Sequence, residues 1–267
     1  MLRNERNIEI FNDTLKQSAE KYPVNIKQNV RYYSEGNFPV AEPMTNVFTP
    51  IFMVQGGTVS TGYANADNMQ VAILNFADAI YAGGLVWIGE NTQEENICRC
   101  SNLYQVLGDE ESDKQYYIPN HHETLRSGRD IYLDNIIYAR DITVFKNDIT
   151  YENIEPKKLD VITCPAPSDY MPMNEALPVY IRRIERILMS AVDNGAECIV
   201  LGAWGCGAFG QDPKLVAQAF ARAINSYGGH FKRIIFAIRP TYDGEKSEMY
   251  KIFKDTLTEW CKTEVIE

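Results

Sequence analysis

The chain has 267 residues, of which 45% are hydrophobic and 23% are charged. These ordinary globular proportions exclude a disordered chain, a coiled coil and a collagen-like chain, and the length suits one large domain. Acidic residues outnumber basic residues by 36 to 26, which gives a formal net charge of -10. This charge argues against a broad surface for nucleic acid or for an anionic membrane, although backbone N–H groups can still bind phosphate locally.

The cysteine pattern and the first residues indicate a compartment. Six cysteines in a chain this long, with no C-x-x-C pair, do not form a disulfide framework. The polar start of the chain has no apolar run of the kind a signal peptide needs, and the longest apolar runs have strand length. We therefore expect a soluble, cytoplasmic protein with reduced thiols. His121 and His122, even taken with Cys98 and Cys100, lack the spacing of a zinc site, so we predict no metal.

The first half of the chain predicts two helices and one strand. Ile8, Phe11 and Leu15 fall at helical spacing and predict an amphipathic helix over residues 6–21. Residues 25–60 show no clear pattern. A strand is predicted over residues 70–75, and a loop that contains glycine follows it to residue 91. A helix is then expected over residues 92–107, followed by an exposed polar insertion over residues 108–130.

In the second half, apolar strands alternate with helices. Strands are predicted at residues 135–138, 142–145, 159–164, 197–201 and 231–238, and helices at residues 175–194, at 213–227 and up to about 261. This alternation predicts βαβ units and a largely parallel sheet that is covered on both faces. Ligands of such sheets bind beyond the carboxyl ends of the strands, which points to the loops after Asn75, Cys164 and Leu201. Arg182 and Arg183 are expected on a solvated helix face.

The loop after Leu201 contains G-x-G-x-x-G at residues 205–210, between a strand and a helix. Glycines in this position let the backbone approach a phosphate at the start of a helix. A dinucleotide site would need an acidic residue at the end of the next strand, and Arg239 stands there instead. Because arginine suits a 2′-phosphate, an NADP-binding oxidoreductase remains one alternative. A glycine turn without any ligand is another.

The loop after Asn75 leads into a pair of glutamates. Thr92 and Glu95 have the spacing of a capping box, in which the threonine is the N-cap and the glutamate is the third helical residue. Acidic residues also suit the first turn of a helix. Glu94 and Glu95 are helical neighbours that point about 100° apart, so one of them would act alone. This helix start nevertheless lies where the sheet is expected to place its ligand.

The residues of this region closely resemble a known signature. The run NFADAIYAGGLVWIGENTQEENICRCSNLY resembles that of microbial poly(ADP-ribose) glycohydrolases, in which a strand ending in N-F-A is followed by a glycine loop and by Q-E-E at the start of a helix. VITCPAPSDY is similar to the family's strand ending in P-A-P, and VLGAWGCGAFGQDPKLVAQAF to its second phosphate loop. RNIEIFNDTL resembles its leading helix. The resemblance covers most of the chain and is weakest over residues 25–65 and 108–130.

The resemblance implies an α/β fold, namely a three-layer α/β/α macrodomain with a mixed, largely parallel central sheet. The macrodomain would span residues 66–267, and residues 1–65 would form an N-terminal helical extension packed on it. The implied activity is hydrolysis of the O-glycosidic ribose–ribose or ribose–protein bonds of ADP-ribosylated targets, without a cofactor. The expected partners are ADP-ribose and poly- or mono-ADP-ribosylated protein.

The resemblance also implies roles for residues. Glu95 would protonate the leaving ribose oxygen and then activate water, while Glu94 and Gln93 would position the substrate. The diphosphate would help to stabilise an oxocarbenium-like transition state. The implied ligand-binding residues are Asn75, Asp78, Gly83, Gly84, Gln93, Gly205, Cys206, Gly207, Ala208, Phe209 and Gly210.

Two positions depart from the family pattern. Leu85 replaces the third glycine of the loop, where a Cβ restricts positive φ. Asp78 replaces an asparagine or serine, and it can only accept hydrogen bonds unless it is protonated. It also adds negative charge near a diphosphate. These departures keep a further alternative open, in which the chain is an ADP-ribose-binding reader with little or no hydrolysis.

Overall fold

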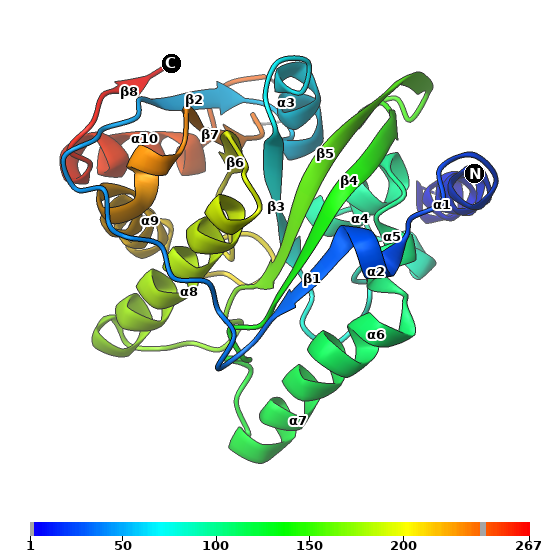
Figure 1. Cartoon of the computed structure of the whole chain (residues 1–267), viewed down its shortest axis with the longest axis horizontal. Coiled ribbons are helices and arrows are strands. Elements are labelled where there is room, and N and C mark those ends of the chain that lie inside the picture. The colour runs from blue at the N-terminus through cyan, green and yellow to red at the C-terminus, as the bar shows by residue number, and fades with distance from the viewer. Residues whose placement is uncertain (1–2, 241–243) are drawn as a thin grey trace.

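The computed structural model describes residues 3–240 and 244–267. Its centre is an eight-stranded sheet with the order β1-β4-β5-β3-β6-β7-β2-β8 (Figure 1). The strands are β1 (Val30–Tyr33), β2 (Ile51–Gln55), β3 (Val71–Ala77), β4 (Ile136–Lys146), β5 (Asn153–Pro165), β6 (Cys198–Leu201), β7 (Arg233–Ile238) and β8 (Val265–Ile266). β4 pairs antiparallel with β1 and β5, and the remaining pairs are parallel. The predicted mixed, largely parallel sheet is therefore confirmed.

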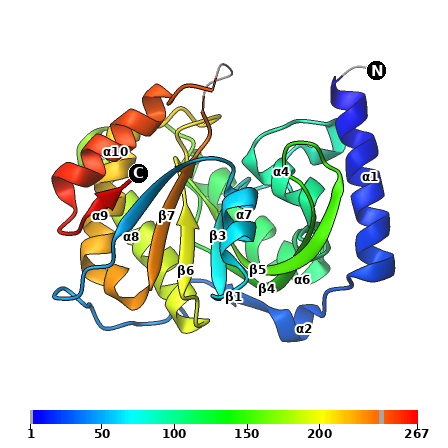
Figure 2. The same ribbon diagram turned by 90° about the horizontal axis from the view of Figure 1, so that it is seen from above.

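Helices cover both faces of the sheet. They are α1 (Arg3–Lys21), α2 (Ile26–Asn29), α3 (Thr58–Asn65), α4 (Gln93–Cys100), α5 (Tyr104–Leu107), α6 (Glu110–Ser112), α7 (Ile118–Ser127), α8 (Met173–Asp193), α9 (Pro213–Tyr227) and α10 (Glu248–Trp260). α8, α9 and α10 lie together on one side, and α1, α4 and α6 lie on the other (Figure 2). The remaining helical segments are two short 3₁₀ turns, η1 (Val86–Ile88) and η3 (Gly228–His230), and a π-helical segment, η2 (Asp113–Tyr117).

Successive side chains of a strand point to opposite faces of the sheet, and each face carries a hydrophobic core. On β3, Ala72 and Leu74 join the core under α8, α9 and α10. Val71 and Ile73 of the same strand join the second core, which contains residues of α3, α4 and α5. Because both faces of the strand are buried, β3 is apolar along its length, as expected for a parallel strand inside an α/β protein. The three-layer architecture follows from this pattern.

The segment without a clear pattern, residues 25–60, contributes two strands to the sheet. β1 and β2 have only four and five residues, and each pairs with a strand from the second half of the chain. The sheet therefore takes two strands from residues 1–65, the part expected as a helical extension. α1, by contrast, is the leading helix that the sequence predicts, with Phe11 fully buried.

Two predicted elements differ from the structure. The helix expected over residues 92–107 is broken at Ser101, whose extended backbone (φ −145°, ψ 174°) forms an isolated bridge to Val144. The expected exposed insertion over residues 108–130 is mostly helical, and it buries Tyr116 and Tyr117 in the second core. In both cases, contacts distant in sequence outweigh the local pattern.

Arg183 is fully buried, so the expectation of a solvated face is wrong for this residue. Its Nε donates to Asp134 Oδ1 at 2.8 Å and its Nη1 to the Pro165 carbonyl at 2.9 Å. Arg182, which is half exposed, binds the same aspartate. The buried guanidinium is satisfied because an acidic partner and carbonyl groups surround it. Its hydrogen bonds connect the segment before β4 with the end of β5.

The helices in the described part of the chain are all too short or too polar to span a membrane.

Candidate functional site

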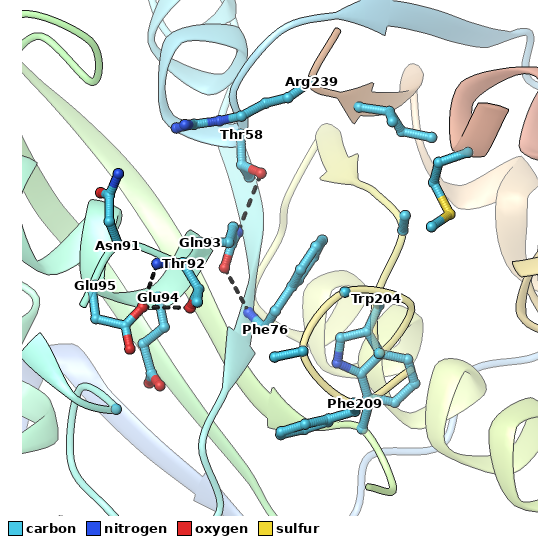
Figure 3. A pocket seen from close by; sticks show the side chains of 18 of the residues that line it. Thr58, Phe76, Asn91, Thr92, Gln93, Glu94, Glu95, Trp204, Phe209 and Arg239 are labelled. Atoms are coloured by element: carbon cyan, nitrogen blue, oxygen red, sulfur yellow. Dashed lines mark hydrogen bonds between the residues drawn. The ribbon is translucent and has the colours of Figure 1, made fainter. Parts of the chain in front are cut away.

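A cavity of about 710 Å³ opens where the sheet rule places it (Figure 3). Its wall begins with Phe76 and Asp78 at the end of β3 and continues through the first residues of α4. Ala166 lines it beyond β5, residues 203–205 and 207–209 line it beyond β6, and Arg239 lines it beyond β7. The three loops singled out from the sequence thus meet at one cavity, which has the size of an ordinary small-molecule site.

Glu95 is held at the edge of the cavity with only 4% of its surface exposed. The Leu85 N–H donates to its Oε1 at 3.0 Å, and the Thr92 N–H donates to its Oε2 at 2.9 Å. The Thr92 hydroxyl also binds Oε2, and the capping box is complete (Figure 3). The helix cap and the cavity carboxylate are therefore the same group. Its orientation is set from both ends of the segment between residues 85 and 92.

Glu94 is buried on the other side of the helix start. The side-chain amide of Asn75 donates to its Oε1 at 3.0 Å, and the Asp78 N–H donates to its Oε2 at 2.8 Å. Burial raises the pKa of Glu94 well above its usual range, and the nearby charges of Asp78 and Glu95 add to this rise. Both oxygens of Glu94 nevertheless accept a hydrogen bond from the protein. Asn75 is fully buried and does not line the cavity, but it contacts Glu94, which does.

Gln93 uses its amide within the protein. Its Oε1 accepts from the Phe76 N–H at 2.8 Å, and its Nε2 donates to the Thr58 hydroxyl at 3.2 Å (Figure 3). Nε2 also donates to the Leu74 carbonyl at 2.8 Å. The side chain lines the cavity. These bonds fix the first residue of α4 against the end of β3 and the start of α3.

Gly84 packs directly against both carboxylates. Its φ is +60°, and a Cβ at this position would lie 3.2 Å from Glu94 Oε2 and would overlap Glu95 Oε1. Glycine is therefore required both by the backbone and by the carboxylates. Gly83 is different, because a Cβ there would meet the Tyr104 ring at 2.9 Å and because the residue does not line the cavity.

The two departures from the family pattern have clear local environments. Asp78 accepts from the N–H groups of Ile80 and Tyr81 at 2.7 and 2.8 Å. Burial raises the pKa of Asp78, while these two bonds oppose the rise. Leu85 has φ −100° and ψ 33°, so the restriction expected from a Cβ at this position does not arise. Its side chain is 45% exposed and lines the cavity.

The loop after β6 forms the opposite wall. Gly205, Gly207, Ala208 and Phe209 line the cavity, whereas Cys206 and Gly210 do not. Within residues 3–240 and 244–267, the N–H groups of Gly207, Ala208 and Phe209 have no protein acceptor. Three consecutive N–H donors beside the cavity suit an anion. The Cys206 thiol is buried, and burial raises its pKa to about 12.

Several residues that line the cavity are not predicted from the sequence to belong to this site. Thr58 comes from the start of α3, Asn91 from the end of the first loop, and Met249 from α10. The sequence indicates Arg239 only as a contact for the 2′-phosphate of NADP. It is the one basic side chain among the described lining residues, and it donates to Asn96 Oδ1 at 3.1 Å. The lining carboxylates outnumber it, so an anion in this cavity depends on backbone N–H groups.

Taken together, these features define a class of protein. A largely parallel α/β sheet carries a cavity with a glycine-rich loop and its unpaired N–H groups on one side and two buried, hydrogen-bonded glutamates on the other. This arrangement suits acid–base chemistry on a phosphorylated sugar.

The model of one family, the catalytic domain of microbial-type poly(ADP-ribose) glycohydrolase (PARG), matches residues 8–147, which are 140 of the 267 residues. The chain therefore belongs to this family. No curated protein matches the chain significantly. The resemblance noted in the sequence is confirmed.

Solved structures of the same family are similar to the chain over nearly its whole length. Poly(ADP-ribose) glycohydrolase from Thermomonospora curvata is 27% identical with a TM-score of 0.76, covering 94% of this chain and 99% of that chain. Its complex with the inhibitor ADP-HPD is 27% identical with a TM-score of 0.75, covering 93% and 98%. The enzyme from Deinococcus radiodurans in complex with ADP-ribose is 26% identical with a TM-score of 0.77, covering 88% and 97%.

Proposed function

We propose that this protein hydrolyses the O-glycosidic ribose–ribose or ribose–protein bonds of ADP-ribosylated targets, with Glu95 as general acid and base. The observation that carries the proposal is the buried Glu95 carboxylate, which two backbone N–H groups hold at the edge of the cavity. Family membership and the similarity to ADP-ribose- and inhibitor-bound glycohydrolases support it. The free cysteines support a reducing, cytoplasmic location.

The two walls of the cavity suggest how the substrate lies. The diphosphate would contact the free N–H groups of Gly207, Ala208 and Phe209. The reacting ribose would then extend across the cavity toward Gly84 and Glu95. Glu94, which also lines the cavity, would position this ribose by a hydrogen bond.

The chemistry then needs Glu95 to transfer two protons, one to the leaving oxygen and one from the attacking water. Protonated Glu95 gives its proton to the leaving oxygen as the C1–O bond breaks. The anomeric carbon gains oxocarbenium character, and the diphosphate helps to stabilise the developing positive charge. The Glu95 carboxylate next takes a proton from the water that attacks this carbon. The products are ADP-ribose and the hydroxyl of the leaving group, and Glu95 is protonated again.

The test compares the parent with Glu95→Gln on poly(ADP-ribose) and on mono-ADP-ribosylated protein. We expect the rate of ADP-ribose release to fall by about 10²–10⁴-fold, the usual share of general acid–base catalysis, while the Kd for ADP-ribose changes by less than about threefold. Glu110→Gln is the matched control, since Glu110 is an exposed glutamate in the first turn of α6, outside the cavity.

Each outcome has a distinct meaning. Release by Glu95→Gln at the parent rate would contradict the role of Glu95. Absence of release by the parent, with ADP-ribose still bound, would favour the reader that the sequence left open. Stabilisation by NADP but not by ADP-ribose in a thermal-shift experiment would favour the oxidoreductase.

A further inference from the structure

α1 packs against the outer side of the segment that carries the first glycine loop and α4. In Figures 1 and 2 it lies at the far side of the molecule from α9 and α10, next to α4. Its contacts fall on both parts of that segment: Asn7 binds Gly89 in the loop, and Thr14 binds Arg99 in α4. None of the α1 residues lines the cavity.

The contact with the loop is close and directional. Asn7 is 5% exposed, and its side-chain Nδ2 donates to the Gly89 carbonyl at 2.8 Å. Gly89 ends η1 with φ +83°, and a Cβ on it would lie 2.8 Å from the Asn4 Cα. The backbone of α1 and the backbone of the loop therefore touch, and the buried amide fixes their register.

Aromatic rings secure the same segment one turn further along α1. Phe11 is fully buried and packs edge-on against Trp87 and Tyr104, with ring centroids 4.9 and 5.1 Å apart. The Trp87 Nε1 donates to the Tyr104 hydroxyl at 2.6 Å. Such edge-to-face pairs add to the burial energy of the rings. At the next turn, Thr14 Oγ1 donates to the Arg99 carbonyl at 2.7 Å.

The position of this segment gives the contacts their significance. Residues 86–91 lie between Leu85 and Thr92, whose N–H groups hold the two oxygens of the Glu95 carboxylate. We propose that α1 is a brace that fixes the distance between these two donors, and that Asn7 is a positioning residue for Glu95. This inference rests on the proposed function, because it takes Glu95 as the acting carboxylate.

A small displacement of such a carboxylate has a large effect on its reaction. A shift of about 1 Å in a reacting group costs about 10²-fold in rate. Loss of one of the contacts between α1 and the loop loosens the segment without removing it, so a smaller loss is expected. The opposite wall of the cavity, which would bind the diphosphate, has no contact with Asn7 and keeps its geometry.

The experiment uses the full chain with Asn7→Ala, a substitution that suits a helix. We expect kcat to fall about tenfold while the Kd for ADP-ribose changes by less than about twofold. Hydrogen exchange of the Leu85 and Thr92 amides should become faster, and that of α9 should not change. Asn12→Ala is the matched control, because Asn12 is exposed on the same helix, and it should leave all three quantities at parent values.

A second arm separates positioning from general stability. In a Glu95→Gln background, measured in single turnovers, Asn7→Ala should lower the residual rate no further, because the group it positions is gone. An equal tenfold loss in that background would overturn the proposal. So would an unchanged kcat, or an unchanged exchange rate at Leu85 and Thr92. If the parent showed no hydrolysis, the proposed function would fail, and the exchange experiment would still decide whether α1 braces the loop.

Discussion

The two glycine loops of the cavity differ in what their backbone N–H groups bind. In the first loop, residues 76–92, the N–H groups of Asp78 and Leu85 donate to carboxylates of the protein itself. In the second loop, residues 202–212, three consecutive N–H groups have no acceptor within the described parts of the chain. Carboxylates at the start of α4 therefore satisfy N–H groups of the first loop, whereas three N–H groups of the second loop are left available to a ligand. The difference suggests that chemistry and binding are carried by separate loops.

The largest expected effect comes from Gly84→Ala in the first loop. A methyl group there would overlap Glu95 Oε1 and lie close to Glu94 Oε2, so both carboxylates would have to move. We expect kcat to fall by at least about 10²-fold, and the Kd for ADP-ribose to change far less. Steady-state hydrolysis and calorimetric titration with ADP-ribose measure the two quantities.

Gly128→Ala is the control that separates the effect of backbone strain from the effect of contact with the carboxylates. Gly128 has a similar φ of +66°, but a Cβ on it would meet nothing within 4 Å. The Gly128→Ala variant should lose about 1–2 kcal/mol of unfolding free energy, which is the cost of a left-handed backbone at alanine, and it should keep the parent kcat. If Gly84→Ala behaved in the same way, the carboxylates would not depend on the loop, and the contrast between the loops would break down.

A smaller effect is expected from Gly207→Ala in the second loop. A Cβ on Gly207 would meet no protein atom within 4 Å, so the free energy of unfolding should stay within about 0.5 kcal/mol of the parent. The same methyl group would stand beside the free N–H groups, and we expect the Kd for ADP-ribose to rise about tenfold. Unchanged affinity in the same titration would show that this loop does not meet the ligand.

The smallest effect is expected from Leu85→Gly, which restores the family's third glycine. Because Leu85 has φ −100°, glycine relieves no strain there, and kcat should stay within about twofold of the parent. The unfolding free energy, measured by urea denaturation, should fall by about 0.5–1 kcal/mol through chain entropy. A steep gain in kcat would instead support the interpretation of the parent as a reader that hydrolyses poorly.

The parts of the fold that the sequence predicts are those with strong local patterns. α9 occupies the predicted residues, since Asp212 caps it and proline follows at its first position. β6 and β7 are continuous apolar runs and were expected. β1 and β2 are as short as β6 but lie outside the regular alternation of strands and helices, and their pairing partners lie far along the chain. The break at Ser101 likewise depends on Val144, a residue of β4.

The site likewise has parts that a local sequence pattern predicts and parts that it does not. One wall is continuous in sequence, from Asp78 to Glu95, and could be predicted because a loop and a helix start carry all its groups. The opposite wall is the G-x-G-x-x-G loop, which the sequence also predicts, whereas Thr58, Arg239 and Met249 come from three distant parts of the chain that no local motif joins. Arg183 shows the same limit in the core, since its burial depends on Asp134, 49 positions away.

The two bonds from Leu85 and Thr92 to one carboxylate close a ring of backbone and side-chain atoms. Most surface loops accept extra residues at little cost, because loop-closure entropy rises slowly with length. This one does not share that freedom, since an added or deleted residue between positions 85 and 92 would pull one donor off the glutamate. We therefore expect the length of this segment to be fixed during evolution even where its side chains vary. A scan of single-residue insertions should find it the least tolerant surface stretch of the chain.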